Sequence, residues 1–209
     1  MTRSFVAILL AIVLTASVQA EFTLGFRGGF NLTNMSEKVN GVSVPVDFNF
    51  KLGLQLGLVG EYTFRDVFAI QPSILFATQG TQVNFNPTIA IININYLQVP
   101  LNFLYKVNFG SVSLLLQAGP YLGFAHSGKI RPERSGFFWG NYTRIEFGRA
   151  NNEMRRLDFG LGVGVGIQSE NVQIGIGYNF GLANLSNINN TTTRNNGFAL
   201  TTTIFLIPK

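Results

Sequence analysis

The sequence predicts an all-β protein, a closed antiparallel up-and-down transmembrane β-barrel of about eight strands. Three observations predict it: large apolar residues alternate with small ones, short turns alternate with long polar connections, and the polar face carries few charges. The alternation is clearest in "LDFGLGVGVGIQ", residues 157–168, where every odd position is large and apolar and most even positions are glycine. A period of two residues indicates a strand with two different faces.

Four strands are predicted in the first half of the chain. In each, a face of Phe, Leu, Ile or Val alternates with a face rich in Gly, Thr, Asn, Gln or Ser. The fourth strand changes phase upstream, where Ile92 and Ile94 take the polar positions, so we expect a β-bulge near Asn95. These strands lie near residues 22–32, 47–64, 67–79 and 96–107.

Four more strands are predicted in the second half. The last of them, "GFALTTTIFLI", has the weakest contrast, because Phe205 and Ile207 interrupt the alternation. Between strands, tight turns are expected at residues 65–66, 108–110 and 169–171, and long polar loops at 34–46, 80–91, 126–155 and 184–196. Short turns on one side and long loops on the other are typical of a barrel that separates two compartments. These strands lie near residues 112–125, 157–168, 172–182 and 197–207.

The composition favours lipid as the environment of the apolar face. Hydrophobic residues make up 46% of the 209 residues and charged residues only 12%, against roughly 25% charged in soluble proteins. A soluble barrel would turn a charged face to water, whereas here the polar face consists mainly of small and uncharged residues. We therefore expect the hydrophobes to face lipid and the glycines to fill a narrow lumen, with aromatic residues in girdles at the strand ends.

The first twenty residues have the pattern of a secretory signal peptide. Arg3 precedes the apolar run "FVAILLAIVL", and small residues at Val18 and Ala20 mark a cleavage site. The run is shorter than the ~20 residues that a membrane helix needs. We expect a signal peptide at 1–20, cleaved after Ala20, and one barrel domain at 21–209.

Other classes of function lack support in the sequence. The chain has no cysteine, which excludes disulfides and thiolate metal sites. The net charge of +5 is modest and only one loop is locally rich in Lys and Arg, so nucleic acid is not an expected partner. No pattern indicates a cofactor or a metal ion.

Several segments resemble the PorT-type outer-membrane β-barrel family of Bacteroidetes-like bacteria. They are "GFRGGFNLTNMS", "YLQVPLNFLYKV", "LLQAGPYLGF" and "LDFGLGVGVGIQ…IGIGYNFGLANLS", which occur in this order over nearly all of the chain after residue 20. The resemblance implies residence in the outer membrane of a Gram-negative bacterium. It also allows a non-enzymatic, structural or interaction role, as an accessory to secretion or envelope assembly, with outer-membrane lipid and other envelope proteins as partners.

Four charged residues fall on the lumen-facing positions: Arg27, Lys51, Glu61 and Asp158. A narrow lumen of low dielectric constant penalises lone charges, so these residues should form a polar network. We expect Asp158 to approach Lys51 or Arg27 across the lumen. The alternative is a ring of charges that selects ions in a small pore.

The longest predicted loop, residues 126–155, is rich in basic and aromatic residues. These could bind lipopolysaccharide, a glycan or a partner protein, as in an adhesin, or they could simply extend two strands above the membrane with interfacial aromatics. The candidate binding residues are Lys129, Arg131, Arg134, Trp139, Tyr142 and Arg144.

His126 is the only histidine, and it is followed by Ser127. A lipid-modifying hydrolase would need this histidine to contact both a serine and an acidic partner. Adjacent residues on a strand point to opposite faces, so the pair is poorly placed for catalysis. We expect no catalytic residues, which leaves a structural or interaction barrel as the main hypothesis and a small pore or a surface binder as alternatives.

Overall fold

The fold was analysed in a computed structural model of the chain. The structure describes residues 20–43, 48–64, 66–85, 88–134, 137–138, 141–151 and 153–206. Residues 1–19 of the expected signal peptide lie outside this part, and Ala20 is the first residue of the first strand. Within the described part, no helix is long and apolar enough to cross a membrane.

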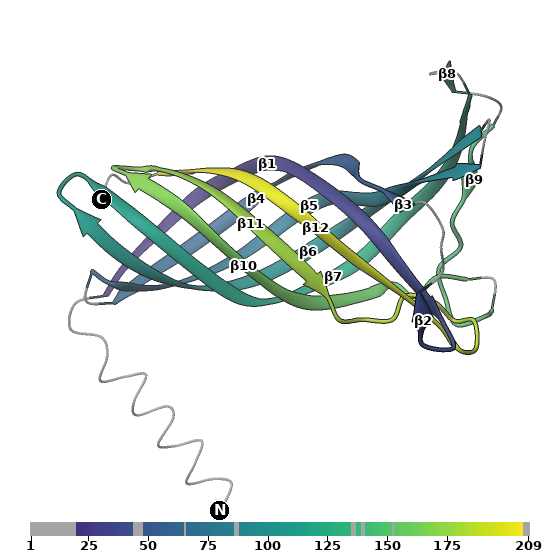
Figure 1. Ribbon diagram of the computed structural model, residues 1–209. Helices are drawn as coiled ribbons and strands as arrows, with labels where there is room; N and C mark the ends of the chain where they lie inside the picture. The colour runs from purple at the N-terminus through teal and green to yellow at the C-terminus, as the bar shows by residue number, and fades with distance from the viewer. Residues whose placement is uncertain are drawn as a thin grey trace, which may run out of the picture.

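Eight long antiparallel strands form a closed ring (Figure 1). Neighbours in the ring follow the chain, in the order β1-β4-β5-β6-β7-β10-β11-β12, and β12 pairs back with β1. Closure pairs the backbone of every long strand on both sides, which lipid requires because it offers no hydrogen bonds. The strands are β1 (Ala20–Val39), β4 (Lys51–Phe64), β5 (Phe68–Phe85), β6 (Thr88–Phe109), β7 (Val112–Arg134), β10 (Leu157–Ser169), β11 (Val172–Gly181) and β12 (Thr191–Phe205).

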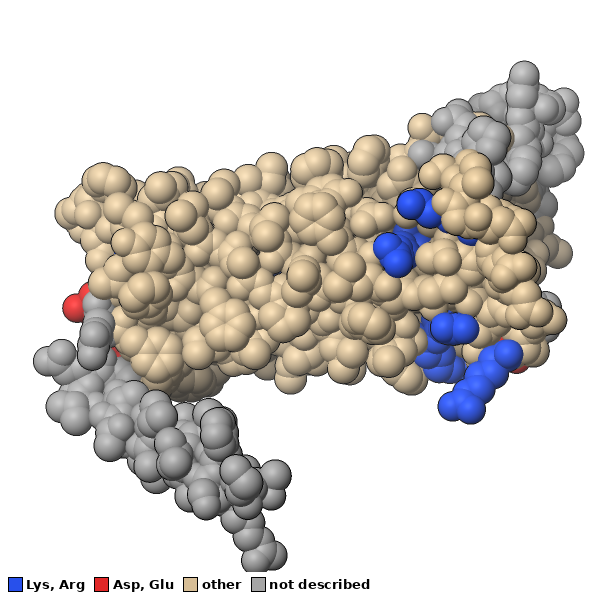
Figure 2. Space-filling view, turned by 60° about the horizontal axis from the view of Figure 1, so that its bottom comes forward, with Lys and Arg blue, Asp and Glu red and all other residues tan. Residues whose placement is uncertain are grey.

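The predicted assignment of the two faces is confirmed. On β10, Leu161 and Ile167 expose 49% and 52% of their surface on the outer wall, whereas Asp158 exposes none. The same alternation runs along the other long strands. Figure 2 shows that the wall between the two ends of the barrel carries no charged side chain on the face in view. This apolar band is the surface that contacts lipid.

Glycines are needed where neighbouring strands come very close. A Cβ atom on Gly57 would lie 2.0 Å from the carbonyl oxygen of Ile74, and one on Gly119 would lie 1.9 Å from that of Leu101. Both distances are far inside van der Waals contact. These glycines therefore allow the strongly curved wall to close, in addition to leaving room in the lumen.

The predicted tight turns are confirmed, and they lie at the same end of the barrel as the end of β12 (Figure 1). Two of them contain a non-glycine residue with positive φ, Asp66 at 57° and Glu170 at 50°, and the third contains Gly110 at 68°. In barrels of this kind the short turns face the periplasm and the long loops face outward. We therefore call the turn-bearing end the inner end and the other the outer end.

The expected bulge is also confirmed, because the pairing of β6 with β7 shifts between Asn95 and Tyr96. The prediction of a loop at residues 80–91 was wrong. The β5–β6 hairpin continues above the bulge until Phe85 pairs with Thr88. In this part of the hairpin, polar side chains interrupt the alternation of apolar and polar residues. The strands nevertheless continue, since a sheet can remain paired after it leaves the lipid.

Four short strands extend the outer end: β2 (Val42–Ser43), β3 (Phe48–Asn49), β8 (Phe137–Phe138) and β9 (Thr143–Arg144). β9 pairs with β7, where Lys129 lies opposite Arg144. Because β7 itself continues to Arg134, the first part of the loop predicted at 126–155 is an extension of the barrel wall. These extensions carry the outer surface described below.

Candidate functional site

A buried ion pair occupies the inner half of the lumen. The ammonium group of Lys106 on β6 donates to Glu61 Oε1 on β4 at 2.5 Å. The Glu61 carboxylate also accepts from Thr63 Oγ1 at 3.0 Å and from Gln71 Nε2. Lys106 and Glu61 expose only 6% and 0% of their side chains, so the pair depends on these partners for the solvation that water would give.

Arg27 joins the same network from β1. Its Nη2 donates to Gln71 Oε1 at 2.7 Å and its Nε to Thr203 Oγ1 on β12 at 2.8 Å. Gln71 also donates to Gln173 Oε1 on β11 at 3.0 Å. The chain of contacts from Arg27 through Gln71 to Glu61 and Lys106 therefore ties strands on opposite sides of the barrel together.

Sequence reasoning included Arg27 and Glu61 in the lumen network but left out Lys106, the residue that pairs with Glu61. Lys106 shares its even-numbered, polar face of the strand with Gln98 and Asn102. This position on the polar face was the sequence signal that could have placed Lys106 in the lumen. The strand stagger that brings Lys106 level with Glu61 was not visible in the sequence.

Asp158 lies in the outer half of the lumen and does not form the expected ion pair. Its Oδ2 accepts from Asn195 Nδ2 at 3.0 Å, and the same amide donates to the Tyr96 hydroxyl at 3.1 Å. Among the described residues, no ion pair joins Asp158 to Arg27 or Lys51. The expectation was wrong because Arg27 is engaged by Gln71 and Thr203 in a different layer of the lumen.

Lys51 begins β4 at the outer end, and its ammonium group donates to the carbonyl oxygen of Leu52 at 3.1 Å. It is buried, as predicted for the lumen-facing position, but it belongs neither to the Glu61 network nor to the Asp158 cluster. Of the four predicted charges, Arg27 and Glu61 share the inner network, whereas Asp158 and Lys51 each lie apart from it, so the four do not form one ring.

Little space remains between these side chains. A cavity of about 60 Å³ lies near Arg27, Gln55 and Tyr121, and another of about 10 Å³ lies near Asn195. A water molecule takes up about 30 Å³ in the liquid. The larger cavity thus accommodates only a few waters, and the described lumen contains no wide channel.

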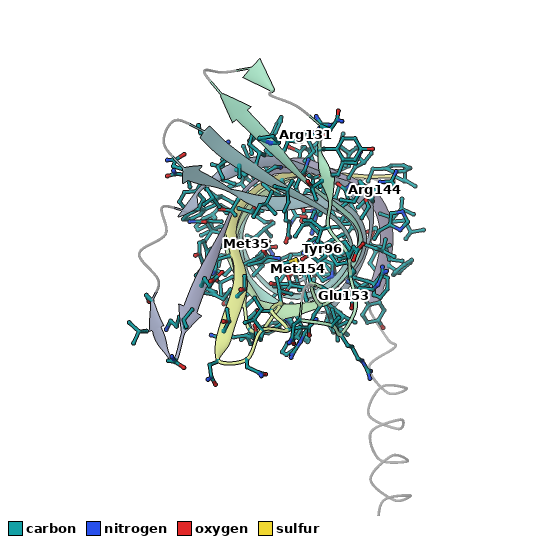
Figure 3. The ribbon with its side chains drawn as sticks, turned by 90° about the vertical axis from the view of Figure 1, so that its right-hand side faces the viewer. Met35, Tyr96, Arg131, Arg144, Glu153 and Met154 are labelled. Carbon is teal, nitrogen blue, oxygen red and sulfur yellow. The ribbon has the colours of Figure 1, made fainter. Side chains whose placement is uncertain are left out.

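An apolar cluster, which we call the plug, lies at the outer mouth of the barrel. Met35, Ile94, Tyr96 and Ala125 are buried together inside the wall. Figure 3, a view from the outer end, places Met35, Tyr96 and Met154 within the ring of strands. The segment between β9 and β10 packs against this cluster through Ile145, Phe147 and Met154.

Backbone hydrogen bonds hold that segment in place. Ile145 N donates to Gly128 O at 3.0 Å, and Arg155 N donates to Leu185 O at 2.9 Å. The side-chain amide of Asn187 donates to the carbonyl oxygens of Gly148 and Glu153, both at 3.0 Å. The plug is therefore fixed to β7 and to the β11–β12 connection, and sequence reasoning gave no sign of it.

Four of the predicted surface residues come together on the outside of the barrel. The ammonium group of Lys129 lies 4.5 Å from the ring centre of Tyr142, and the guanidinium of Arg131 lies 5.9 Å from it. A hydrogen bond from Arg144, together with the charges of Arg144, Lys129 and Arg131, lowers the pKa of the Tyr142 phenol. Figure 3 shows Arg131 and Arg144 outside the ring.

The two other predicted surface residues are Arg134 and Trp139. Arg134 is the last residue of β7, and Trp139 lies outside the described residues. Arg156, which was not predicted, adds a cation just before β10, where its guanidinium lies 5.9 Å from the Phe124 ring and 5.4 Å from the Phe147 ring. We call Lys129, Arg131, Tyr142, Arg144 and Arg156 the outer cationic surface.

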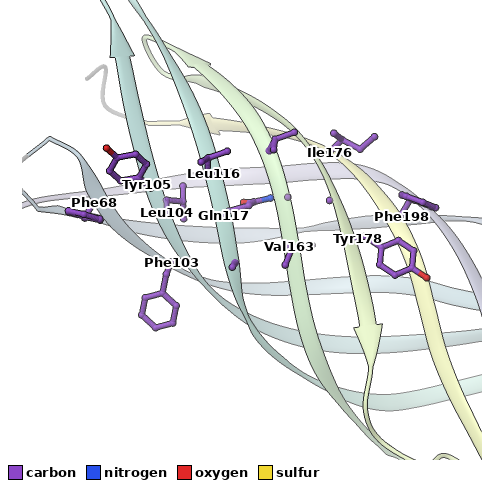
Figure 4. Close-up of a pocket in the computed structure, with 14 residues that line it drawn as sticks. Phe68, Phe103, Leu104, Tyr105, Leu116, Gln117, Val163, Ile176, Tyr178 and Phe198 are labelled. Atoms are coloured by element: carbon purple, nitrogen blue, oxygen red, sulfur yellow. The ribbon is translucent and has the colours of Figure 1, made fainter.

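The lipid-facing wall has one broad depression of about 640 Å³ over β6, β7, β10 and β11 (Figure 4). Phe103 and Tyr105 border it on one side and Tyr178 on the other, with Val163 and Val165 between them. It lies within the apolar band, so the acyl chains of the membrane fill it.

The described residues do not assemble a hydrolytic site. His126 is exposed on the outer wall, and its neighbour Ser127 accepts a hydrogen bond from Asn95 Nδ2 at 3.0 Å. No hydrogen bond to a carboxylate orients this histidine among the described residues. Nor does this part of the chain contain a group of His, Asp and Glu that could hold a metal ion.

Comparison with known proteins identifies the class of barrel. The family model described as "Outer membrane protein beta-barrel domain" matches residues 15–187. No curated protein matches the sequence.

Solved structures with a similar arrangement are also found. Ail of Yersinia pestis, in complex with the heparin analogue sucrose octasulfate, is 16% identical, with a TM-score of 0.41 over 89% of this chain and 99% of its own. OprG of Pseudomonas aeruginosa is 13% identical, with a TM-score of 0.48 over 88% of this chain and 95% of its own. The outer membrane protease OmpT of Escherichia coli is 11% identical, with a TM-score of 0.44 over 93% of this chain and 100% of its own.

Proposed function

The chain belongs to the outer membrane protein beta-barrel domain family, and on this premise we propose that it is a sealed, non-enzymatic barrel that acts through its outer surface. The observation that carries the proposal is the filling of the lumen. An ion-paired network occupies the inner half, only a small cavity follows, and an apolar plug covers the outer mouth.

The structural role follows from the same contacts. Side chains from seven of the eight long strands, all except β7, take part in the inner network. Such a network fixes the position of each strand relative to the others, and barrels of this size are usually filled by their own side chains. The barrel then serves as a rigid support for the outer extensions.

Single-channel recording in a planar bilayer tests the proposal. We expect no stepwise conductance from the full chain in 1 M KCl, because ions meet both the network and the plug. A variant that combines Arg27→Ala and Gln71→Ala with Met154→Asp removes side chains that cross the lumen and loosens the plug, so it should admit ions more readily. Regular conductance steps from the unmodified chain would overturn the proposal and favour the small pore.

The PorT-type resemblance supports a finer role, as an accessory to secretion or envelope assembly that binds other envelope proteins. Chemical cross-linking in native outer membranes, followed by purification of the tagged chain, tests this role. We expect a defined partner at a fixed ratio to the barrel. Recovery of the barrel alone, under conditions that cross-link a known envelope complex in the same membranes, would overturn it.

A further inference from the structure

We propose that the outer cationic surface binds the phosphate groups of a phosphorylated glycolipid of the outer leaflet, that is, lipopolysaccharide. The inference names a partner for the outer surface and so rests on the proposed function. It starts from where the cations lie relative to the apolar band.

Arg156 marks the edge of that band. It directly precedes Leu157, the first lipid-facing residue of β10, and its guanidinium lies over the ring of Phe124, the last lipid-facing aromatic of β7. Its Nη1 donates to the carbonyl oxygen of Ala125 at 3.4 Å. Arg156 is therefore at the level where hydrocarbon gives way to headgroups.

The other cations continue upward from this level. Lys129 lies five residues beyond Phe124 on β7, which corresponds to about 16 Å along the strand and about 12 Å above the band at a tilt of about 40°. The headgroup layer is about 5–7 Å thick on each side of a bilayer. Long basic side chains can bend back toward it, so the surface spans the layer that holds the lipid phosphates.

Three cations of this surface, Lys129, Arg144 and Arg156, are available to a ligand. Lys129 and Arg144 face each other across the β7–β9 pair, and Arg144 and Arg156 are exposed. Among the described residues, no ion pair links Lys129, Arg144 or Arg156 to a carboxylate. A hydrogen bond from Arg144, together with the charges of Arg144, Lys129 and Arg131, already favours the negative form of Tyr142, as the lowered pKa of its phenol indicates. A phosphate is a stronger acceptor of charge-assisted hydrogen bonds than a phenolate.

The position favours lipid over a soluble polyanion. A glycan that approaches from outside would bind cations at the tips of the extensions, whereas Arg156 lies against Phe124 at the membrane edge. A lipid can place its acyl chains along the apolar wall and its phosphates on Arg156, Lys129 and Arg144 at the same time. This combination of apolar and anionic contacts is what the surface presents.

Native mass spectrometry of the full chain in detergent, titrated with bis-phosphorylated lipid A or with dephosphorylated lipid A, tests the proposal. Each cation near an anionic lipid surface is worth about fivefold in affinity. The variant Lys129→Ala/Arg144→Ala should therefore bind lipid A about 25-fold more weakly. The matched control Lys38→Ala/Arg194→Ala removes two exposed cations from the outer ends of β1 and β12, and we expect its affinity to remain within about twofold of the unmodified chain.

Two further measurements keep the test decisive. The variant Lys129→Arg/Arg144→Lys preserves both charges and should retain binding, while heat-dependent gel mobility reports that each variant is folded. Equal binding of the two lipid forms, equal loss in the control variant, or stronger binding of soluble heparin than of lipid A would each overturn the proposal. If the barrel conducts ions but still binds lipid A through this surface, the proposed sealed lumen is refuted and the lipid-binding proposal stands.

Discussion

Loss of either member of the buried Glu61–Lys106 pair should destabilise the barrel strongly. Lys106→Met removes the ammonium partner of the Glu61 carboxylate and leaves its contacts with the neutral donors Thr63 and Gln71. Glu61→Gln removes the carboxylate beside Lys106 and leaves its ammonium group with neutral acceptors, namely the introduced amide oxygen, Thr63 Oγ1 at 3.5 Å and Gln168 Oε1 at 3.4 Å. Because each change strands a charge that is less than a tenth exposed, we expect each to lower the free energy of unfolding by about 3–5 kcal/mol.

The double variant Glu61→Gln/Lys106→Met should recover most of that loss. It contains no charge in the inner lumen apart from Arg27, and the amide oxygen introduced in place of the carboxylate would still accept from Thr63 or Gln71. A buried ion pair replaced by neutral groups of similar volume is often close to neutral in stability. The expected coupling between the two sites is therefore several kcal/mol, well above what independent sites show.

Reversible urea titration of the barrel in phospholipid vesicles, followed by circular dichroism, measures these differences. Lys38→Met is the matched control, because Lys38 is exposed at the outer end of β1 and should change stability by less than about 0.5 kcal/mol. Single variants that each lose under about 1 kcal/mol, or a double variant whose loss equals the sum of the two, would refute the assignment of this pair as the centre of the network.

Four other changes test separate parts of the structure. Asp158→Asn should leave stability unchanged or raise it by about 1 kcal/mol in the same urea titration, because it removes a buried charge without an ionic partner. Gly119→Val should prevent folding, judged by gel mobility, because its Cβ would overlap the Leu101 carbonyl. Met154→Asp should loosen the plug and speed hydrogen exchange in the segment before β10, without changing exchange in the inner turns. Arg144→Ala should raise the pKa of Tyr142 toward its ordinary value in an ultraviolet titration, with Tyr142→Phe to identify the signal.

The assignment of faces was predictable because it depends on a local property. In β10 the alternation of Leu161 and Val163 with Gly160 and Gly162 has one interpretation once the few charges rule out a water-facing side. The bulge near Asn95 was predictable for the same reason, since a change of phase is itself a local signal. The ends of the strands could not be predicted in this way. Polar strand segments above the lipid, such as residues 80–85, stay paired although they have no apolar face to mark them in the sequence.

The partners inside the lumen depend on a quantity that one sequence does not contain. Parity places Arg27, Glu61, Lys106 and Asp158 on the inner face, but the stagger between strands decides which of them share a layer. The actual register brings Lys106 to Glu61 and Asn195 to Asp158. The plug could not be predicted from the sequence for a similar reason. Met154 is held at the mouth by hydrogen bonds between two connections that are remote in sequence.

The filled lumen has a consequence for where function can reside. In an eight-stranded barrel the interior is barely wide enough for side chains, so any side chain larger than glycine or serine on the inner face removes space for a solute. This chain places arginine, lysine, glutamine and tyrosine there, and it adds an apolar plug above them. On the proposed function, recognition falls to the outer end, where Lys129 and Arg131 lie around the Tyr142 ring.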